Sequence, residues 1–139
     1  MTGDTAISGD GHISSLLSIY NTGTAGTGIV DDITSGNIRV DKNGWYYVIF
    51  QTTSKTSSGA DVWYPKIYTY NGTSQSSLAY GHVYNDTGLN STQTISVLVD
   101  ISDASTIKLR MGYENASNIT LFGTGQAVTA MHILRIGDT

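Results

Sequence analysis

The sequence predicts a single-domain, all-β sandwich of about 8–10 strands. Short apolar segments recur along the chain, and Gly, Asn, Asp and Ser separate them, which is typical of strands joined by tight turns. The 139 residues include 16 Gly and only 13% charged residues, about half the usual share, so the composition disfavours helices. A chain of this length forms one domain with a core of its own.

The composition also excludes several classes of function. The chain has no Cys, so we expect no disulfide and no thiolate metal site, and a bacterial or viral source is favoured. A net charge of −4 with only 7 Lys and Arg residues argues against nucleic-acid binding, which needs a basic surface. No apolar run approaches the ~20 residues of a membrane span, and residues 1–5 have no feature of a signal peptide.

Turn-forming residues set the limits of the predicted strands. Asn71-Gly72 predicts a type I′ hairpin turn, and Gly44 supplies the positive φ that a turn after Asn43 needs. Residues 100–103 predict a third turn, and Pro65 predicts an edge or a bulge within its strand. The predicted strands are residues 11–20, 37–41, 45–54, 62–70, 77–85, 94–101, 106–113, 119–122 and 127–136.

Some of these segments are apolar on one face and others on both. Every second residue of 106–113 is apolar, and only Leu98 breaks the same alternation in 94–101, so each strand has one buried and one wet face. Residues 45–50 are apolar at every position, and the first and last predicted strands also have two apolar faces. Because one sandwich has one interior, we expect the second face to contact a partner. The alternative is that loops cover it, or that Tyr46 or Tyr47 reaches water at the rim.

Four blocks of the chain resemble the tumour necrosis factor (TNF)-like and complement globular-head superfamily, over roughly residues 12–137. Residues 36–50 are similar to the strand with a Gly-x-Tyr-x-Val/Phe motif, and residues 67–72 to the strand that ends in Asn-Gly. Residues 96–109 are similar to the family's paired strands around a Gly-Asp turn, although this turn lacks Gly. Residues 129–136 are similar to the closing strand.

The resemblance implies a jelly roll of two facing sheets, here residues 12–139, after an N-terminal arm at residues 1–11. It also implies a homotrimer, formed by the sheet that holds the first, third and last predicted strands. Those are the strands with two apolar faces. The trimer interface is therefore expected at Ile13, Leu17, Ile19, Trp45, Tyr46, Tyr47, Ile49, Phe50, Met131, His132, Ile133 and Leu134.

The candidate metal ligands are three histidines and one pair of aspartates. His12, His82 and His132 lack the spacing of a zinc motif, although three copies of His132 could meet on a threefold axis and hold an ion. Asp31 and Asp32 lie in a predicted loop, and some members of the superfamily bind calcium near the apex of the trimer. The sequence has no EF-hand loop, and we expect a solvated acidic loop, an ordinary interface histidine, no resident metal and no cofactor.

No catalytic signature occurs in the sequence, and we expect no enzymatic activity. The Gly-x-Ser-x-Gly elbow is missing, and no carboxylate lies in an apolar strand that would raise its pKa. Residues 23–28 have the composition of a phosphate-binding loop but lack its Gly-Lys-Ser/Thr ending. Five Asn-x-Ser/Thr sequons are expected by chance in a chain so rich in these residues, and we interpret them as turns: Asn71, Asn85, Asn90, Asn115 and Asn118.

Aromatic residues of one parity form a candidate patch around the Asn71-Gly72 hairpin. If Ile67 and Val83 face the core, these aromatic side chains point outward, which is typical of glycan or protein contacts. The alternative is that they pack inward or against a neighbouring subunit. The patch consists of Tyr64, Tyr68, Tyr70, Tyr80, His82 and Tyr84.

Two hypotheses of function follow. The first is a trimeric virion structural protein, a bacteriophage capsid decoration (cement) protein on the capsid exterior, which stabilises the shell by binding only its assembled form. Its partner would be the major capsid protein or another virion protein, contacted by the arm through Thr2, Asp4, Ile7 and Asp10. The second is a glycan- or receptor-binding head of a phage fibre or spike, or of a bacterial surface appendage. A secreted cytokine-like ligand is disfavoured by the absence of a signal peptide and of a disulfide.

Overall fold

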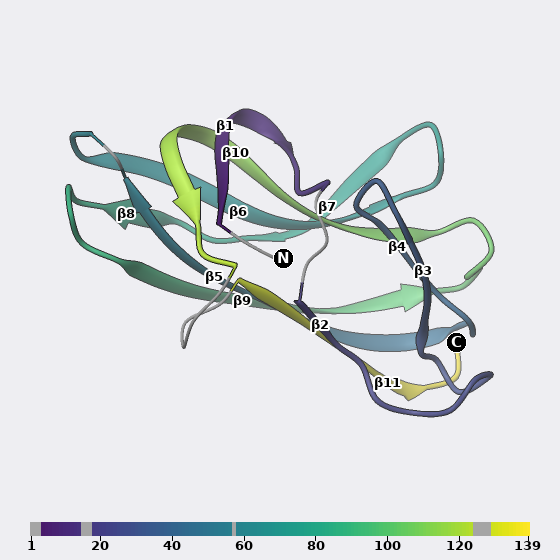
Figure 1. Ribbon diagram of the computed structural model, residues 1–139. Coiled ribbons are helices and arrows are strands. Elements are labelled where there is room, and N and C mark those ends of the chain that lie inside the picture. The colour runs from purple at the N-terminus through teal and green to yellow at the C-terminus, as the bar shows by residue number, and fades with distance from the viewer. Residues whose placement is uncertain (1–3, 15–17, 57, 124–128) are drawn as a thin grey trace.

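The computed structural model describes residues 4–14, 18–56, 58–123 and 129–139. The described residues form eleven strands in two facing layers (Figure 1), and none of them belongs to a helix that could cross a membrane. The strands are β1 (Thr5–His12), β2 (Ser18–Tyr20), β3 (Val30–Thr34), β4 (Asn37–Val40), β5 (Gly44–Thr56), β6 (Asp61–Tyr70), β7 (Gln75–Tyr80), β8 (Val83–Asn85), β9 (Ser91–Ile101), β10 (Lys108–Leu121) and β11 (Ala130–Gly137).

One layer holds β2, β11, β5 and β9 in that order. β11 pairs parallel with β2 and antiparallel with β5, and β5 pairs with β9 along residues 44–54. The other layer holds β7, β6 and β10, with β1 and β4 on the far edge of β10 and β3 beyond β4. The last residues of β10 also pair with β5, through Leu121 and Ser54, so the layers join into one curled sheet. The predicted all-β sandwich is confirmed.

The core fills the space between the two layers. Alternate residues of β5 point into it, because successive side chains of a strand face opposite sides of the sheet. Tyr46, Val48 and Phe50 are all 0% exposed. The one-sided alternation predicted for 94–101 and 106–113 is also confirmed, with Leu109 and Met111 buried and Leu98 exposed. The largest fully buried side chains are Trp63, Tyr46, Phe50, Ile38, Ile67, Ile101, Leu109, Met111, Ile119, Leu121, Met131 and Val40.

The predicted strands 106–113 and 119–122 are in fact one strand, β10. Along its pairing with β1 the register shifts twice, between Ile7 and Gly9 and between Gly9 and Gly11, so β10 carries an extra residue at each point. Asn115 and Asn118 lie in these bulges and take positive φ values of 58° and 53°. Asn tolerates this conformation better than most residues, so these two sequons mark bulges within a strand rather than turns between strands.

The N-terminal segment is part of the sheet rather than a separate arm. β1 pairs with β10, and Ile7 is 6% exposed within the core, so Ile7 cannot contact a capsid as predicted. The carboxylates of Asp4 and Asp10 are exposed and accept backbone N–H groups from Gly123 (3.1 Å) and Asn115 (2.8 Å). Thr2 lies outside the described residues. The alternation of apolar and polar residues is weak here because Gly9 and Gly11 have no side chains, so β1 was not predicted from the sequence. β3 was not predicted either.

The predicted turns differ in two respects from those observed. Residues 100 and 101, predicted to begin a turn, still belong to β9, and the chain turns after Asp103, whose carbonyl accepts the N–H groups of Thr106 and Ile107. Gly44 has the predicted positive φ, at +154°. At the 71–72 hairpin only Gly72 has positive φ, so the turn is not type I′, which needs positive φ at both central residues. Instead, the Asn71 side chain accepts the N–H groups of Thr73 (3.0 Å) and Ser74 (2.9 Å) and closes a longer loop. Pro65 lies where the partner of β6 changes from β7 to β8, so its missing N–H interrupts no ladder.

A buried polar cluster joins β5, β6 and β8. The side-chain oxygen of Asn85 accepts hydrogen bonds from the Trp63 indole (2.9 Å) and the Ser54 hydroxyl (3.1 Å). The Asn85 amide donates to the Ser54 carbonyl at 3.0 Å. All three residues are 0% exposed, so each polar atom depends on this cluster for its partner. The predicted turn role of the Asn85 sequon is therefore wrong.

Replacing Asn85 with Ala should destabilise the fold by about 2–3 kcal/mol, because the Trp63 indole N–H loses its acceptor while buried. Urea unfolding followed by tryptophan fluorescence measures this change. Asn90→Ala is the matched control, since Asn90 is exposed in a loop, and it should lie within about 0.5 kcal/mol of the wild type. Equal stability of the two variants would contradict the role given to the cluster.

Candidate functional site

The sheet of β2, β11, β5 and β9 has a second face that no other part of the described chain covers. Trp45 and Tyr47 on β5 are 41% and 37% exposed, and Leu134 and Ile136 on β11 are 53% and 54% exposed. These residues are exposed because side chains alternate between the two faces of a strand, and the residues between them fill the core. We call this surface the apolar face, and it consists of Tyr20, Trp45, Tyr47, Ile49, Leu98, His132, Leu134 and Ile136.

A shallow hollow of about 350 Å³ lies within the apolar face. The His132 ring stacks on Tyr20, with ring centroids 4.8 Å apart and an interplanar angle of 17°. The remaining lining comes from Thr22, Tyr47, Ile49, Ile133 and Leu134, so the hollow contains no Asp, Glu, Lys or Arg side chain. Such a hollow suits an apolar partner, because a charged group would lose its hydration there without gaining a counter-ion.

The structure divides the predicted trimer interface between two faces of the sheet. Trp45, Tyr47, Ile49, His132 and Leu134 lie on the apolar face as predicted. The side chains of the others belong to the core of the protomer: Ile13, Tyr46, Phe50, Met131 and Ile133 are 0–3% exposed, and Ile19 is half-buried against the core. Leu17 lies outside the described residues.

The sequence could not show which residues face the core and which face outward, because these strands have apolar residues on both faces. Tyr46 shows the ambiguity: it is in the core, and its hydroxyl donates to the backbone carbonyl of Lys42. Burial raises the pKa of the Tyr46 hydroxyl, with a smaller opposing effect of Arg135. Tyr20, Leu98 and Ile136 were missed as part of the face. Leu98 had a signal in the sequence, since it is the residue that breaks the alternation of its strand.

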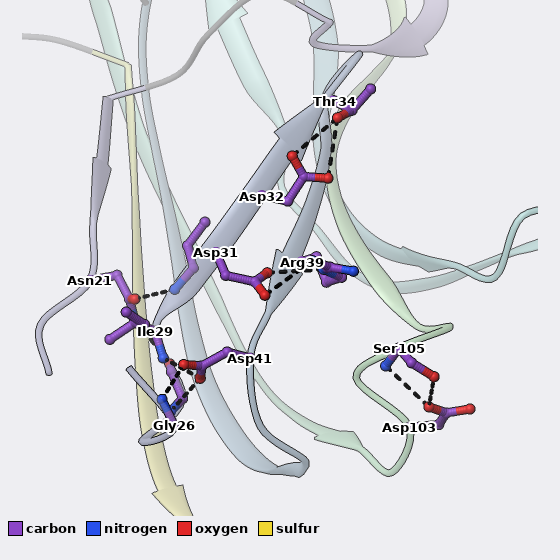
Figure 2. Close-up of polar contacts among 12 residues, drawn as sticks. Asn21, Gly26, Ile29, Asp31, Asp32, Thr34, Arg39, Asp41, Asp103 and Ser105 are labelled. Atoms are coloured by element: carbon purple, nitrogen blue, oxygen red, sulfur yellow. Dashed lines mark hydrogen bonds and ion pairs between the residues drawn. The ribbon is translucent and has the colours of Figure 1, made fainter. Parts of the chain in front are cut away.

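Next to this face, the glycine-rich loop 23–28 is closed by Asp41 (Figure 2). The Asp41 carboxylate accepts N–H groups from Gly26, Gly28 (2.8 Å) and Ile29 (3.0 Å). Asn21 ties the same loop to β11, since its amide donates to the carbonyl of Ile133 at 2.8 Å. The N–H groups that would hold a phosphate in such a loop are therefore used by a carboxylate of the chain itself.

These hydrogen bonds lower the pKa of Asp41. Partial desolvation raises the pKa, and the N–H groups of Gly26, Gly28 and Ile29 together outweigh that effect. A carboxyl group with a lowered pKa in the folded state adds stability above its unfolded pKa, and this contribution disappears as the pH falls through the folded pKa.

The candidate metal ligands are not brought together. Asp31 binds Arg39 through two hydrogen bonds of 3.0 and 3.1 Å, whereas Asp32 accepts from the Thr34 hydroxyl at 3.2 Å (Figure 2). The three histidines also lie apart, since His12 donates to the Ser35 carbonyl, His82 contacts Tyr64 and His132 stacks on Tyr20. Across the ranges that the structure describes, no three His, Asp or Glu residues gather into a metal-binding group.

The predicted aromatic patch does not form one surface. Tyr80 and Tyr84 are 69% and 57% exposed, and His82 is exposed with its ring 5.4 Å from that of half-buried Tyr64. Tyr68, by contrast, is only 4% exposed, so its prediction as an outward contact residue is wrong. It lies so close to Gly112 that a Cβ there would be 2.3 Å from the Tyr68 ring. Tyr70 is half-buried, with the Arg110 guanidinium 3.5 Å from its ring centroid.

Comparison with known proteins places the fold. No family model matches the sequence, and no curated protein matches it. Among solved structures, the chain is similar to that described as "Structure of Eiger TNF from S. frugiperda", with a TM-score of 0.66 and 11% identity over 99% of this chain and 88% of that one. The chain has a TNF-like jelly-roll fold. The fold implied by the sequence blocks is thus confirmed, and at this identity the likeness concerns the fold alone.

Replacing Asp41 with Asn should destabilise the protein by about 1 kcal/mol at pH 7, because the amide keeps only one of two acceptor oxygens at a solvent-accessible loop. As the pH falls through the lowered pKa of Asp41, the two proteins should approach equal stability, because the wild-type carboxyl group becomes protonated and loses its extra contribution. Thermal unfolding from pH 2 to pH 7 measures both effects. Asp86→Asn is the control, since Asp86 accepts one N–H instead of three. A difference between wild type and Asp41→Asn that did not vary with pH would contradict this account.

Proposed function

We propose that this protein is a non-enzymatic structural subunit that acts as a homotrimer, assembled through its apolar face. The observation that carries the proposal is the exposure of six large apolar side chains on one sheet, each 37–54% exposed: Tyr20, Trp45, Tyr47, Leu98, Leu134 and Ile136. Contiguous apolar surface of this kind is typical of interaction sites rather than of monomers. Burying it releases roughly 25 cal/mol for each Å² removed from water.

A second copy of the chain is the partner that best fits this surface. The face offers aliphatic and aromatic groups and almost no charge, so its partner must be similarly apolar, and the same face of another copy has that property. Closed symmetry would also remove the surface from water completely, as is usual for soluble homo-oligomers. The resemblance to TNF-like proteins supports three copies. That family trimerises through the sheet that corresponds to β2, β11, β5 and β9, whose outer face is exposed here.

We further propose that the trimer decorates a virion. The support is the compact all-β head, the composition without catalytic or nucleic-acid-binding features, and the free outer layer that a trimer would present. The exposed side chains of Asp4 and Asp10 would then lie on the surface that contacts the major capsid protein or another virion protein. Binding to the assembled shell alone would stabilise it by mass action.

Replacing Leu134 with Asp should convert a trimer of three 14.8 kDa chains into monomers, because each copy would place an unpaired carboxylate in the interface. Sedimentation equilibrium at micromolar concentration measures the mass. Leu89→Asp is the matched control, since Leu89 is 62% exposed in the loop between β8 and β9, outside the apolar face, and this variant should remain trimeric. A wild-type protein that sediments as a monomer would refute the proposal, and one that sediments as a dimer would refute the trimer.

The virion role has its own test. Antibodies against the purified protein should label the exterior of intact virus particles from the same source in electron micrographs. Particles stripped of the protein should open at a lower temperature and recover when it is added back. Absence of the protein from intact particles would leave the trimer standing and remove the capsid role.

A further inference from the structure

A second hollow, of about 200 Å³, lies in the other layer, where the end of β1 meets β6 and β10. Its volume equals that of roughly seven water molecules at ~30 Å³ each, which is room for one small ligand. Its lining includes Asp10, Gly11 and His12 from β1, together with Lys66, Tyr68 and Glu114 from the neighbouring strands. Nearly all of these side chains are polar, in contrast to the hollow on the apolar face.

Two glycines allow the strands to approach closely enough to form this hollow. A Cβ at Gly112 would lie 2.3 Å from the Tyr68 ring, and one at Gly11 would lie 2.9 Å from the Tyr113 hydroxyl. The Tyr68 hydroxyl reaches the Gly11 carbonyl at 3.5 Å, which is a long hydrogen bond that a better acceptor could replace. The tyrosine hydroxyls are therefore held beside the hollow by a packing arrangement that only Gly permits at these positions.

The hollow has hydrogen-bonding capacity that the protein itself does not use. Glu114 pairs with Lys66 through one oxygen at 2.7 Å, and Asp10 accepts the Asn115 N–H through one oxygen. Within the described part of the chain, the second oxygen of each carboxylate makes no hydrogen bond, and neither does the side-chain amide of Gln75, which also lines the hollow. Acceptors and donors are thus presented together in a small volume.

The charges select the class of ligand. Two carboxylates against one ammonium disfavour a phosphate or sulfate, and the ammonium of Lys66 beside Glu114 disfavours a cation. An apolar ligand would leave the polar groups unpaired, at a cost in free energy. A neutral polyhydroxyl compound satisfies them, because its hydroxyls both donate to carboxylates and accept from ammonium and amide groups.

An aromatic ring at the rim completes the requirements for a sugar. Tyr80 pairs with Lys66 in the register of β6 and β7, so the two side chains project on the same face, and Tyr80 is 69% exposed. A sugar ring has an apolar C–H face that packs on such an amphipathic aromatic group. We infer that this hollow binds a single neutral hexose residue of a glycan, held by Asp10, Glu114, Lys66 and Gln75 and covered by Tyr80.

This inference does not depend on the apolar face, because the two hollows belong to different layers of the sandwich. The glycan-binding hypothesis thereby acquires a specific location. It is one polar hollow rather than the whole predicted aromatic patch. A trimer formed through the apolar face would leave three such sites open, and a virion contact through Asp10 would compete with the sugar for the same carboxylate.

Two-dimensional ¹H–¹⁵N NMR titration of the full chain with methyl α-glucopyranoside, methyl β-galactopyranoside and N-acetylglucosamine tests the inference. At least one sugar should shift the amide signals of Asp10, Lys66 and Glu114 saturably. Glu114→Gln and Asp10→Asn should each weaken its binding about tenfold, because a charge-assisted hydrogen bond becomes a neutral one. Asp86→Asn is the charge-matched control on another part of the surface and should bind as the wild type does.

Two results would overturn the inference: no saturable shift with any of the three sugars, or binding by Glu114→Gln and Asp10→Asn as tight as that of the wild type. The Leu134→Asp variant separates this site from the assembly, since it should bind the sugar unchanged whether or not it is monomeric. Loss of sugar binding in that variant would show that the hollow needs the assembled form, and would overturn its assignment to a single protomer.

Discussion

The central constraint on this structure is that its middle strands have two apolar sides and the sandwich has one interior. β5 pairs with β9 on one edge and β11 on the other, so its side chains can only point into the core or away from it. Tyr46, Val48 and Phe50 take the interior positions at 0% exposure, which leaves Trp45 and Tyr47 outside. The fold of one protomer therefore creates a surface that is stable in water only when something covers it.

Elsewhere the protein satisfies its polar groups internally. Asn85 both accepts and donates hydrogen bonds to groups buried between β5 and β6. Asp41 accepts the backbone N–H groups of the glycine-rich loop 23–28. Arg39 neutralises Asp31 in the same region. The loop 23–28 beside the apolar face is therefore held in place by hydrogen bonds within the protomer.

The sequence was sufficient for the fold class and for most of the strands, because alternation and turn residues are local signals. It was insufficient where these signals fail. β1 lacks side chains at Gly9 and Gly11, and its place in the sheet depends on pairing with residues 100 or more positions away. The interface was only half predicted for a different reason: Met131 and His132 are adjacent, both belong to an apolar strand, and only the tertiary structure decides that the first is buried and the second exposed. The polar hollow left no signal in the sequence, because residues of four separate strands line it: β1, β6, β7 and β10.

The position of β1 also bears on how the protein avoids aggregation. The far edge of β10 would otherwise offer a row of unpaired N–H and C=O groups, which is a template for strands of other chains. β1 covers that edge along residues 112–121, so the exposed edge of the sheet is now that of β1. β1 contains Gly9 and Gly11, and its pairing with β10 has two register shifts. A strand so irregular and so poor in apolar residues is a bad template for further pairing. β1 thus ends the growth of the sheet, and deletion of residues 5–12 would leave the backbone N–H and C=O groups on this edge of β10 without their partners along residues 112–121.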